Sequence, residues 1–169
     1  RSPVILDKGS FCPFNSQNTA WLFGAYELMY IPSHVSFRLG DIWRGFVAQI
    51  CLQAVGMNLS FHSPTVYQDR NTHDLMQDFL EETPGYLHNR KIMDTLLSLQ
   101  LSNKSNDLGM NLLKCWAALC GIGMVPKKEI DLCRAWLKEL EVCKKLPSQQ
   151  NFGRRREFSG GSSHATNKG

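Results

Sequence analysis

The stretch "DIWRGFVAQICLQAV", Asp41 to Val55, decides how the first part of the chain folds. Its apolar side chains recur every four residues in two neighbouring rows. The rows are Ile42, Phe46, Ile50 and Ala54, and Trp43, Val47, Cys51 and Val55. This spacing predicts an amphipathic helix with an apolar side wide enough to be buried against a sheet. Gly56 follows the last apolar position and suits the end of such a helix.

Short extended segments are expected on both sides of this helix. "SPVIL" and "VSFRL" precede it, and "MNLSFHSPTVYQ" follows it with the composition of a strand that Pro64 bends or places at an edge. The order strand, helix, strand predicts an α/β fold for residues 1–70. The 169 residues of the chain are enough for one domain with a sizeable core.

Residues 71–146 are expected to form a helical extension. Thr72 is a candidate N-cap for a first helix that Pro84 would break. Further helices are predicted in residues 86–101, 108–124 and 126–146, and residues 147–169 are predicted to be a disordered basic tail. The expected apolar face of the first helix consists of Leu75, Met76, Phe79 and Leu80.

The charge is unevenly distributed along the chain. Six Lys or Arg residues and one Glu lie between Lys144 and Gly169, whereas the remaining residues have 13 bases and 14 acids. A nucleic-acid-binding fold should carry its basic patch on the folded domain. The nearly neutral body of this chain therefore predicts no nucleic-acid partner.

Six cysteines are present, and none of them forms a CxxC pair that would indicate a zinc site. They are either buried free thiols or members of disulfides formed in an oxidising lumen. The sequons at Asn58 and Asn103 would permit glycosylation in such a compartment. Both interpretations stay open at the level of the sequence.

Asp41 is the first candidate for chemistry. It could be the N-cap of the predicted helix, or a carboxylate at the mouth of an α/β sheet that takes a proton from a hydroxyl or orients a sugar. Arg38 and Arg44 flank it, and each could pair with Asp41 or bind a substrate phosphate. Trp43 could belong to the core or provide a surface on which a sugar ring stacks.

Two further segments could contribute to the same pocket. The loop "CPFNSQNTAW" places amides and hydroxyls in consecutive positions, which suits a ligand with many hydroxyls but also a loop that binds its own backbone. The segment "SPTVYQDRN" ends a predicted strand with polar residues, and ligands favour the carboxyl ends of strands in open α/β sheets. The loop candidates are Asn15, Gln17, Asn18 and Thr19.

Signatures of other enzyme classes are missing from the sequence: it has no GxSxG, P-loop, GxGxxG or HExxH motif. In contrast, "FCPFNSQNT", "RLGDIWRG" and "SPTVYQDRN" occur in an order that resembles the STELLO-type glycosyltransferases. This family was long catalogued as a domain of unknown function. More distantly, the chain resembles the reversibly glycosylated polypeptides, which are UDP-arabinopyranose mutases. The resemblance covers roughly residues 3–70.

The resemblance implies a GT-A-like glycosyltransferase, of which this chain would be the C-terminal, acceptor-side part. It implies a catalytic role for Asp41, a nucleotide-sugar donor and a glycan acceptor. The Asp-rich metal motif of such folds is not evident here, and Gln68 stands where the mutases have a histidine. The resemblance therefore leaves open a divalent metal such as Mn²⁺ in the full-length protein and assigns no metal ligand to this chain. It also implies a Golgi or other secretory membrane location, through an N-terminal anchor outside this sequence.

Two hypotheses follow from the sequence. In the first, the chain is part of an active nucleotide-sugar-dependent glycosyltransferase, with Asp41 as base and the loop amides, Trp43 and the two arginines as substrate ligands. In the second, it is a catalytically inactive, glycosyltransferase-like scaffold or assembly factor in the secretory pathway.

Overall fold

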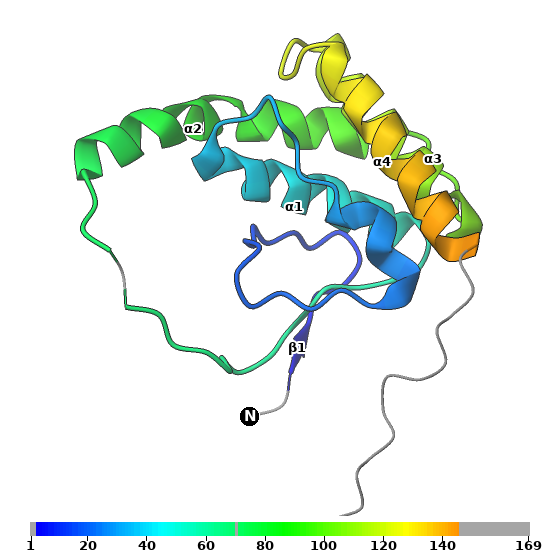
Figure 1. The fold of residues 1–169 in the computed structure, drawn as a ribbon, viewed down its shortest axis with the longest axis horizontal. Helices are drawn as coiled ribbons and strands as arrows, with labels where there is room; N and C mark the ends of the chain where they lie inside the picture. Colours follow the sequence, from blue (N-terminus) through cyan, green and yellow to red (C-terminus); the bar gives the residue numbers. More distant parts are fainter. Residues whose placement is uncertain (1–2, 70, 146–169) are drawn as a thin grey trace, which may run out of the picture.

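Helices dominate the computed structural model, which describes residues 3–69 and 71–145 (Figure 1). The four α-helices are α1 (Phe37–Ala54), α2 (Leu75–Leu97), α3 (Leu108–Gly121) and α4 (Lys128–Lys145). Two short 3-10 helices, η1 (Phe23–Met29) and η2 (Ser105–Asp107), precede α1 and α3. The predicted basic tail, residues 147–169, lies outside the described residues.

The sheet is much smaller than the sequence predicts. Strands β1 (Val4–Ile5) and β2 (Ser60–Phe61) pair antiparallel, with Val4 opposite Phe61. A strand is stable only beside a partner, and residues 62–69 have none among the described residues. The chain is therefore mixed but mostly helical. The prediction of an extended "VSFRL" was wrong, because Phe37 already begins α1.

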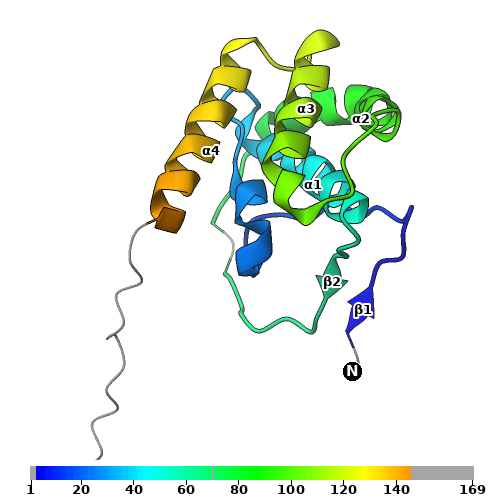
Figure 2. The same cartoon turned by 90° about the vertical axis from the view of Figure 1, so that its right-hand side faces the viewer.

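The predicted apolar rows of α1 form the centre of the fold. Trp43, Phe46, Val47, Ile50 and Cys51 are all buried, which confirms the helix. Their partners are helices, since α1 contacts α2 on one side and α3 on another. The expected burial against a sheet was wrong. The small sheet lies at the end of α1 instead of under its apolar side (Figure 2).

Helix α2 differs from the prediction at both its start and its middle. Asp74, not Thr72, is the N-cap, and its carboxylate accepts hydrogen bonds from the backbone N–H groups of Met76 and Gln77 at 3.0 and 3.2 Å. Pro84 lies inside the helix without ending it. The helix continues because Gly85 packs against Leu39 of α1 and Ile92 is fully buried, so tertiary packing offsets the lost hydrogen bond.

Helix α3 lies between α2 and α4, as Figure 2 shows. Its Trp116 is fully buried, and the ring of Tyr30 meets it edge-on at a centroid distance of 5.9 Å. Leu112 and Leu119 of α3 and Cys133 of α4 complete this part of the core. The predictions for α3 and α4 are confirmed, because both helices carry strong local periodicity.

All six thiols are free in this structure, and Cys51, Cys115 and Cys133 are buried. The Sγ atoms of Cys51 and Cys115 are 3.7 Å apart, in contact between α1 and α3. None of the helices in residues 3–69 and 71–145 combines the length and the apolarity needed to cross a membrane.

Candidate functional site

Asp41 lies one turn inside α1 and does not cap it. The N-cap is Ser36, which has extended backbone angles and makes no side-chain capping hydrogen bond. The interpretation of Asp41 as a cap was therefore wrong. Because Phe37 to Gly40 are already helical, the carboxylate of Asp41 points from the side of the helix and can reach another segment.

The carboxylate of Asp41 holds the loop that precedes η1. Its Oδ2 accepts a hydrogen bond from the backbone N–H of Ser16 at 3.1 Å, and its Oδ1 accepts one from the hydroxyl of Ser16. Nη2 of Arg44 lies 3.5 Å from the same Oδ1. The side chain of Asp41 stays 29% exposed, so it is accessible to solvent although it is fastened to Ser16.

Arg44 is the buried cation behind this carboxylate. Its side chain is 3% exposed, and its guanidinium lies over the rings of Phe14 and Trp21 at 5.8 and 5.2 Å from their centroids. Its Nη2 also donates to the Ser16 hydroxyl at 2.9 Å. Burial lowers the pKa of Arg44, and the charge of Asp41 acts in the opposite direction. The arrangement holds the loop to α1 by stacking as well as by charge.

Two glutamines of α1 fasten the segment before this loop, and the sequence analysis missed both. Gln49 accepts from the Cys12 N–H at 3.0 Å and donates to the Cys12 carbonyl at 2.9 Å. One turn later, Gln53 binds the Gly9 N–H and the Ser10 carbonyl in the same way. The signal in the sequence was two glutamines four residues apart on one helix face. A side-chain amide can accept from a backbone N–H and donate to a backbone C=O, so such a pair can bind an extended segment.

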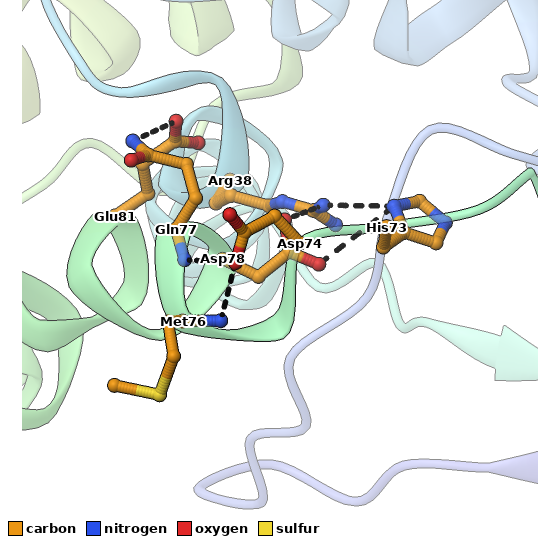
Figure 3. Close-up of polar contacts among 7 residues, drawn as sticks. All are labelled: Arg38, His73, Asp74, Met76, Gln77, Asp78 and Glu81. Atoms are coloured by element: carbon orange, nitrogen blue, oxygen red, sulfur yellow. Dashed lines mark hydrogen bonds and ion pairs between the residues drawn. The ribbon is translucent and has the colours of Figure 1, made fainter.

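The side chain of Arg38 lies at the junction of α1 and α2, beside His73 and Asp78 (Figure 3). Its guanidinium forms an ion pair with Asp78, and its Nη2 is 3.3 Å from Nδ1 of His73. His73 also lies 3.7 Å from the other carboxylate oxygen of Asp78. Arg38 therefore connects the first turn of α1 with the first turn of α2. Its recorded polar contacts are with His73 and Asp78 and do not include Asp41.

The four polar loop residues have different environments. Asn15 and Gln17 are exposed, whereas Thr19 donates its hydroxyl hydrogen bond to the carbonyl of Asn15 at 2.7 Å. Asn18 has a φ of 53°, in the left-handed region that asparagine tolerates. Its Oδ1 accepts a hydrogen bond from the Thr65 hydroxyl at 2.9 Å. The structure thus connects this loop with the segment after β2.

Trp43 is a core residue. It is 5% exposed, and its indole N–H donates to Oδ1 of Asn89 on α2 at 3.0 Å. A ring buried in this way offers no face to a sugar. Gln68 is exposed, and the neighbouring Tyr67 donates its hydroxyl hydrogen bond to Asp69.

Across the described residues, His, Cys, Asp and Glu side chains do not come together in groups of three that would hold a metal ion. One shallow surface hollow lies along α2 and another between α3 and α4. Neither is lined by the candidate residues.

Glu129 at the start of α4 forms a buried polar cluster that the sequence analysis missed. Its side chain is 0% exposed and accepts from the backbone N–H groups of Ser33 and His34 at 3.0 and 2.9 Å. It also binds the Tyr30 hydroxyl and, at 2.6 Å, Nδ1 of His34. The cluster fixes the turn between η1 and α1 to α4. A glutamate at the second position of α4 gives no sign of this role in the sequence.

The Glu129 cluster should make stability depend on acid pH. Burial acts to raise the pKa of Glu129, but the hydrogen bonds from Tyr30, His34 and the Ser33 backbone outweigh it and lower the pKa. A carboxyl with a folded pKa below its unfolded value stabilises the fold above the unfolded pKa, about 4.3, and loses that contribution as pH falls through the folded pKa.

We therefore expect the difference in unfolding free energy between wild type and Glu129→Gln to shrink as pH falls from about 6 toward about 3. Urea titrations at a series of pH values measure this difference. A difference that stays constant over that range would show that ionisation of Glu129 does not stabilise the fold.

The folded chain is thus a small mixed domain in which one helix carries a partly exposed carboxylate and ties a polar loop to itself. The family model of the STELLO glycosyltransferases matches residues 38–150, and the chain belongs to this family. No curated protein matches the chain. The match begins at Arg38 and runs through α2, α3 and α4, which the resemblance in the sequence did not include. The loop that Asp41 holds precedes the match.

Proposed function

We propose that this chain is the acceptor-side part of a nucleotide-sugar-dependent glycosyltransferase, with Asp41 as the carboxylate that orients or deprotonates the acceptor hydroxyl. The membership of the STELLO glycosyltransferases is the observation that carries the proposal. In this proposal the chain adopts the C-terminal part of a GT-A-like domain, and the donor-binding half lies elsewhere in a longer polypeptide. The proposed location is a Golgi or other secretory membrane.

The geometry of Asp41 supports this role. A carboxylate has about four acceptor positions. The Oδ1 atom of Asp41 accepts hydrogen bonds from the Ser16 hydroxyl and from Arg44. Its Oδ2 atom accepts one hydrogen bond, from the Ser16 N–H. One position on a partly exposed carboxylate is thus open to the hydroxyl of an acceptor.

The polar loop supports the same site. Asn15 and Gln17 are exposed in the loop that Ser16 fastens to Asp41, and their amides can donate to and accept from sugar hydroxyls. Asn18 connects this loop with Thr65, so the segment after β2 forms a second side of the proposed site. Arg38, Arg44 and Trp43 are omitted from the substrate ligands, because internal contacts occupy them.

The test is sugar transfer by the full-length protein, because the proposed donor half is required. We expect Asp41→Asn to lower transfer by at least about 100-fold, the usual effect of losing a positioned acid or base. Ser16→Ala is the matched control, because it removes the Oγ contact while the carboxylate stays. We expect it to lower transfer by less than about tenfold.

Equal losses in the two variants would show that Asp41 only positions the loop. Equal rates in wild type and Asp41→Asn would remove Asp41 from the mechanism. Transfer is followed as release of the nucleoside diphosphate from a panel of nucleotide-sugars, and circular dichroism verifies that each variant is folded.

The second candidate function is a catalytically inactive, glycosyltransferase-like scaffold or assembly factor. The observation that favours it is the use of three candidate ligands in internal contacts: Arg38 with Asp78, Arg44 with Ser16, and Trp43 with Asn89. Full-length protein that turns over no nucleotide-sugar, with or without Mn²⁺, would support this function over the first.

A further inference from the structure

The two sequons of the chain have different places in the fold. Asn58 precedes β2, and Ser60, which completes its sequon, lies in that strand. Ser60 pairs with Ile5 of β1, and its hydroxyl is 3.2 Å from Nε2 of His62. The first sequon is therefore built into the small sheet, and its hydroxyl already has a partner.

The second sequon begins at Asn103, in the loop that connects α2 with α3, and the fold holds this loop on its N-terminal side. Leu99 and Leu101 pack against the hydrophobic core. Asn111 of α3 is fully buried, and its amide accepts from the Ser102 N–H at 2.9 Å and donates to the Ser102 carbonyl at 2.8 Å. The backbone directly before Asn103 is thus fixed to α3.

The loop is held on the C-terminal side of Asn103 as well. The Asp107 N–H donates to the Lys104 carbonyl at 3.0 Å, and the Lys104 N–H donates to the Ser102 hydroxyl at 3.3 Å. The Ser102 hydroxyl in turn donates to Oδ2 of Asp107 at 2.6 Å. Asn103 therefore lies in a defined turn between fixed neighbours.

The side chains that form the sequon are free of this network. Asn103 and Ser105 are exposed, as is Lys104 between them. Within residues 3–69 and 71–145, the hydrogen bonds of the loop belong to Ser102, Lys104, Asp107 and Asn111. An exposed asparagine in a loop is ordinary by itself. Here the acceptor amide and the hydroxyl two residues later are both accessible, in the surface position that N-glycosylation requires.

We propose that Asn103 is an N-glycosylation site of this chain, with Ser105 as the hydroxyl that the modifying enzyme recognises. The donor is an oligosaccharide on a polyprenyl diphosphate. Nδ2 of Asn103 forms a bond to the anomeric carbon of the first sugar, and the bond from that carbon to the diphosphate breaks. The polyprenyl diphosphate leaves with the electron pair, and the amide nitrogen loses one proton.

This inference rests on the secretory location in the proposed function, because the donor is presented in the lumen of that pathway. It does not rest on sugar transfer by the chain itself. The contacts of Asp41 and of the polar loop involve Ser16, Arg44 and Thr65, and none of them includes residues 98–107. A glycan on Asn103 would thus leave the contacts of the proposed acceptor site unchanged.

The first test compares the electrophoretic mobility of full-length protein, produced in cells with a secretory pathway, before and after an amidase that removes N-linked glycans. We expect the amidase to increase the mobility of wild type. Asn103→Gln should lose the Asn103 contribution to this shift completely. Asn106→Gln is the matched control, because Asn106 is exposed in the same loop but starts no sequon, and it should keep the full shift.

Changes at Ser105 separate recognition of the sequon from folding. Ser105→Ala should abolish the modification at Asn103 although the asparagine stays, whereas Ser105→Thr should keep it. Cleavage after acidic residues releases residues 95–107 as one peptide with a single sequon. Amidase treatment in ¹⁸O-labelled water marks the glycosylated asparagine as labelled aspartate, and mass spectrometry then identifies the position. We expect the label at Asn103 and not at Asn106.

Three outcomes would overturn the proposal. An amidase shift that Asn58→Gln abolishes and Asn103→Gln leaves intact would make the sheet sequon the acceptor. Unmodified peptide 95–107 from protein that intact microsomes protect against protease would show that Asn103 reaches the lumen without being modified. Protein that the protease digests in intact microsomes would remove the location and the modification together. Sugar transfer by Asn103→Gln at the wild-type rate is expected in the first two cases, so loss of the glycan and loss of the proposed activity are measured separately.

Discussion

Glu129→Ala is expected to lower the unfolding free energy by about 4 kcal/mol, the largest effect we predict for a single side chain. The change removes the shared acceptor of the Tyr30 hydroxyl and of the Ser33 and His34 backbone N–H groups. The Tyr30 hydroxyl is a buried donor and the two backbone N–H groups are part-buried. A donor left buried without a partner costs about 1–3 kcal/mol. Burial and the contact with Glu129 raise the pKa of Tyr30, so its hydroxyl is protonated and acts as a donor at neutral pH.

Chemical denaturation measures this loss of unfolding free energy. Two further variants are compared with Glu129→Ala. Glu129→Gln keeps an acceptor oxygen but replaces the other with an amide, so we expect an intermediate loss of about 2 kcal/mol. Glu139→Ala, at an exposed position of the same helix, should change stability by less than about 0.5 kcal/mol. If Glu129→Ala cost no more than Glu139→Ala, the cluster would contribute nothing to the fold.

The helices that the sequence predicts well are those in which burial and local periodicity agree. In α1, Trp43, Val47 and Cys51 follow one another at intervals of four and are all buried. Trp116 and Cys133 likewise lie on the apolar sides of α3 and α4. A single sequence is sufficient in such segments, because the same residues set the helical period and fill the core.

Prediction failed where distant contacts override local signals. Pro84 is a strong local stop, yet α2 continues because its second half is packed against α1 and α3. Leu75 and Phe79 were predicted to lie on the apolar face of a helix, and both residues are exposed in this chain. A periodic pattern identifies an apolar side, but it does not identify the surface that covers it.

The candidate site illustrates the same limit. Asp41 could be selected from the sequence as a carboxylate beside a helix, but its contact with Ser16 spans 25 residues and has no local signature. The contact between Tyr30 and Glu129 spans 99 residues, and no pattern indicated it. Asn15 and Gln17 were selected from the polar composition of their loop, and both are exposed; their role as ligands stays a prediction.

Arg44→Ala is expected to lower the unfolding free energy by about 3 kcal/mol and to release the loop that contains Ser16. The change removes the cation that lies over the rings of Phe14 and Trp21, together with the hydrogen bond to the Ser16 hydroxyl. Breaking a buried ion pair usually costs about 3–5 kcal/mol. We use the lower end, because Asp41 is 29% exposed and water can solvate its charge once Arg44 is gone.

Arg44→Lys separates charge from stacking. Lysine keeps the positive charge beside Asp41, but an ammonium lacks the planar fork that lies over Phe14 and Trp21 and reaches Ser16 at the same time. We expect Arg44→Lys to recover only about half of the lost unfolding free energy, since the charge interaction alone is modest near solvent.

Hydrogen exchange at the Ser16 amide gives the local measurement, because that N–H donates to Asp41 only while the loop is held. Faster exchange in both variants, in the order Ala above Lys, is the expected result. Wild-type exchange and stability in Arg44→Lys would show that charge alone fastens the loop and that the aromatic rings contribute only to the core.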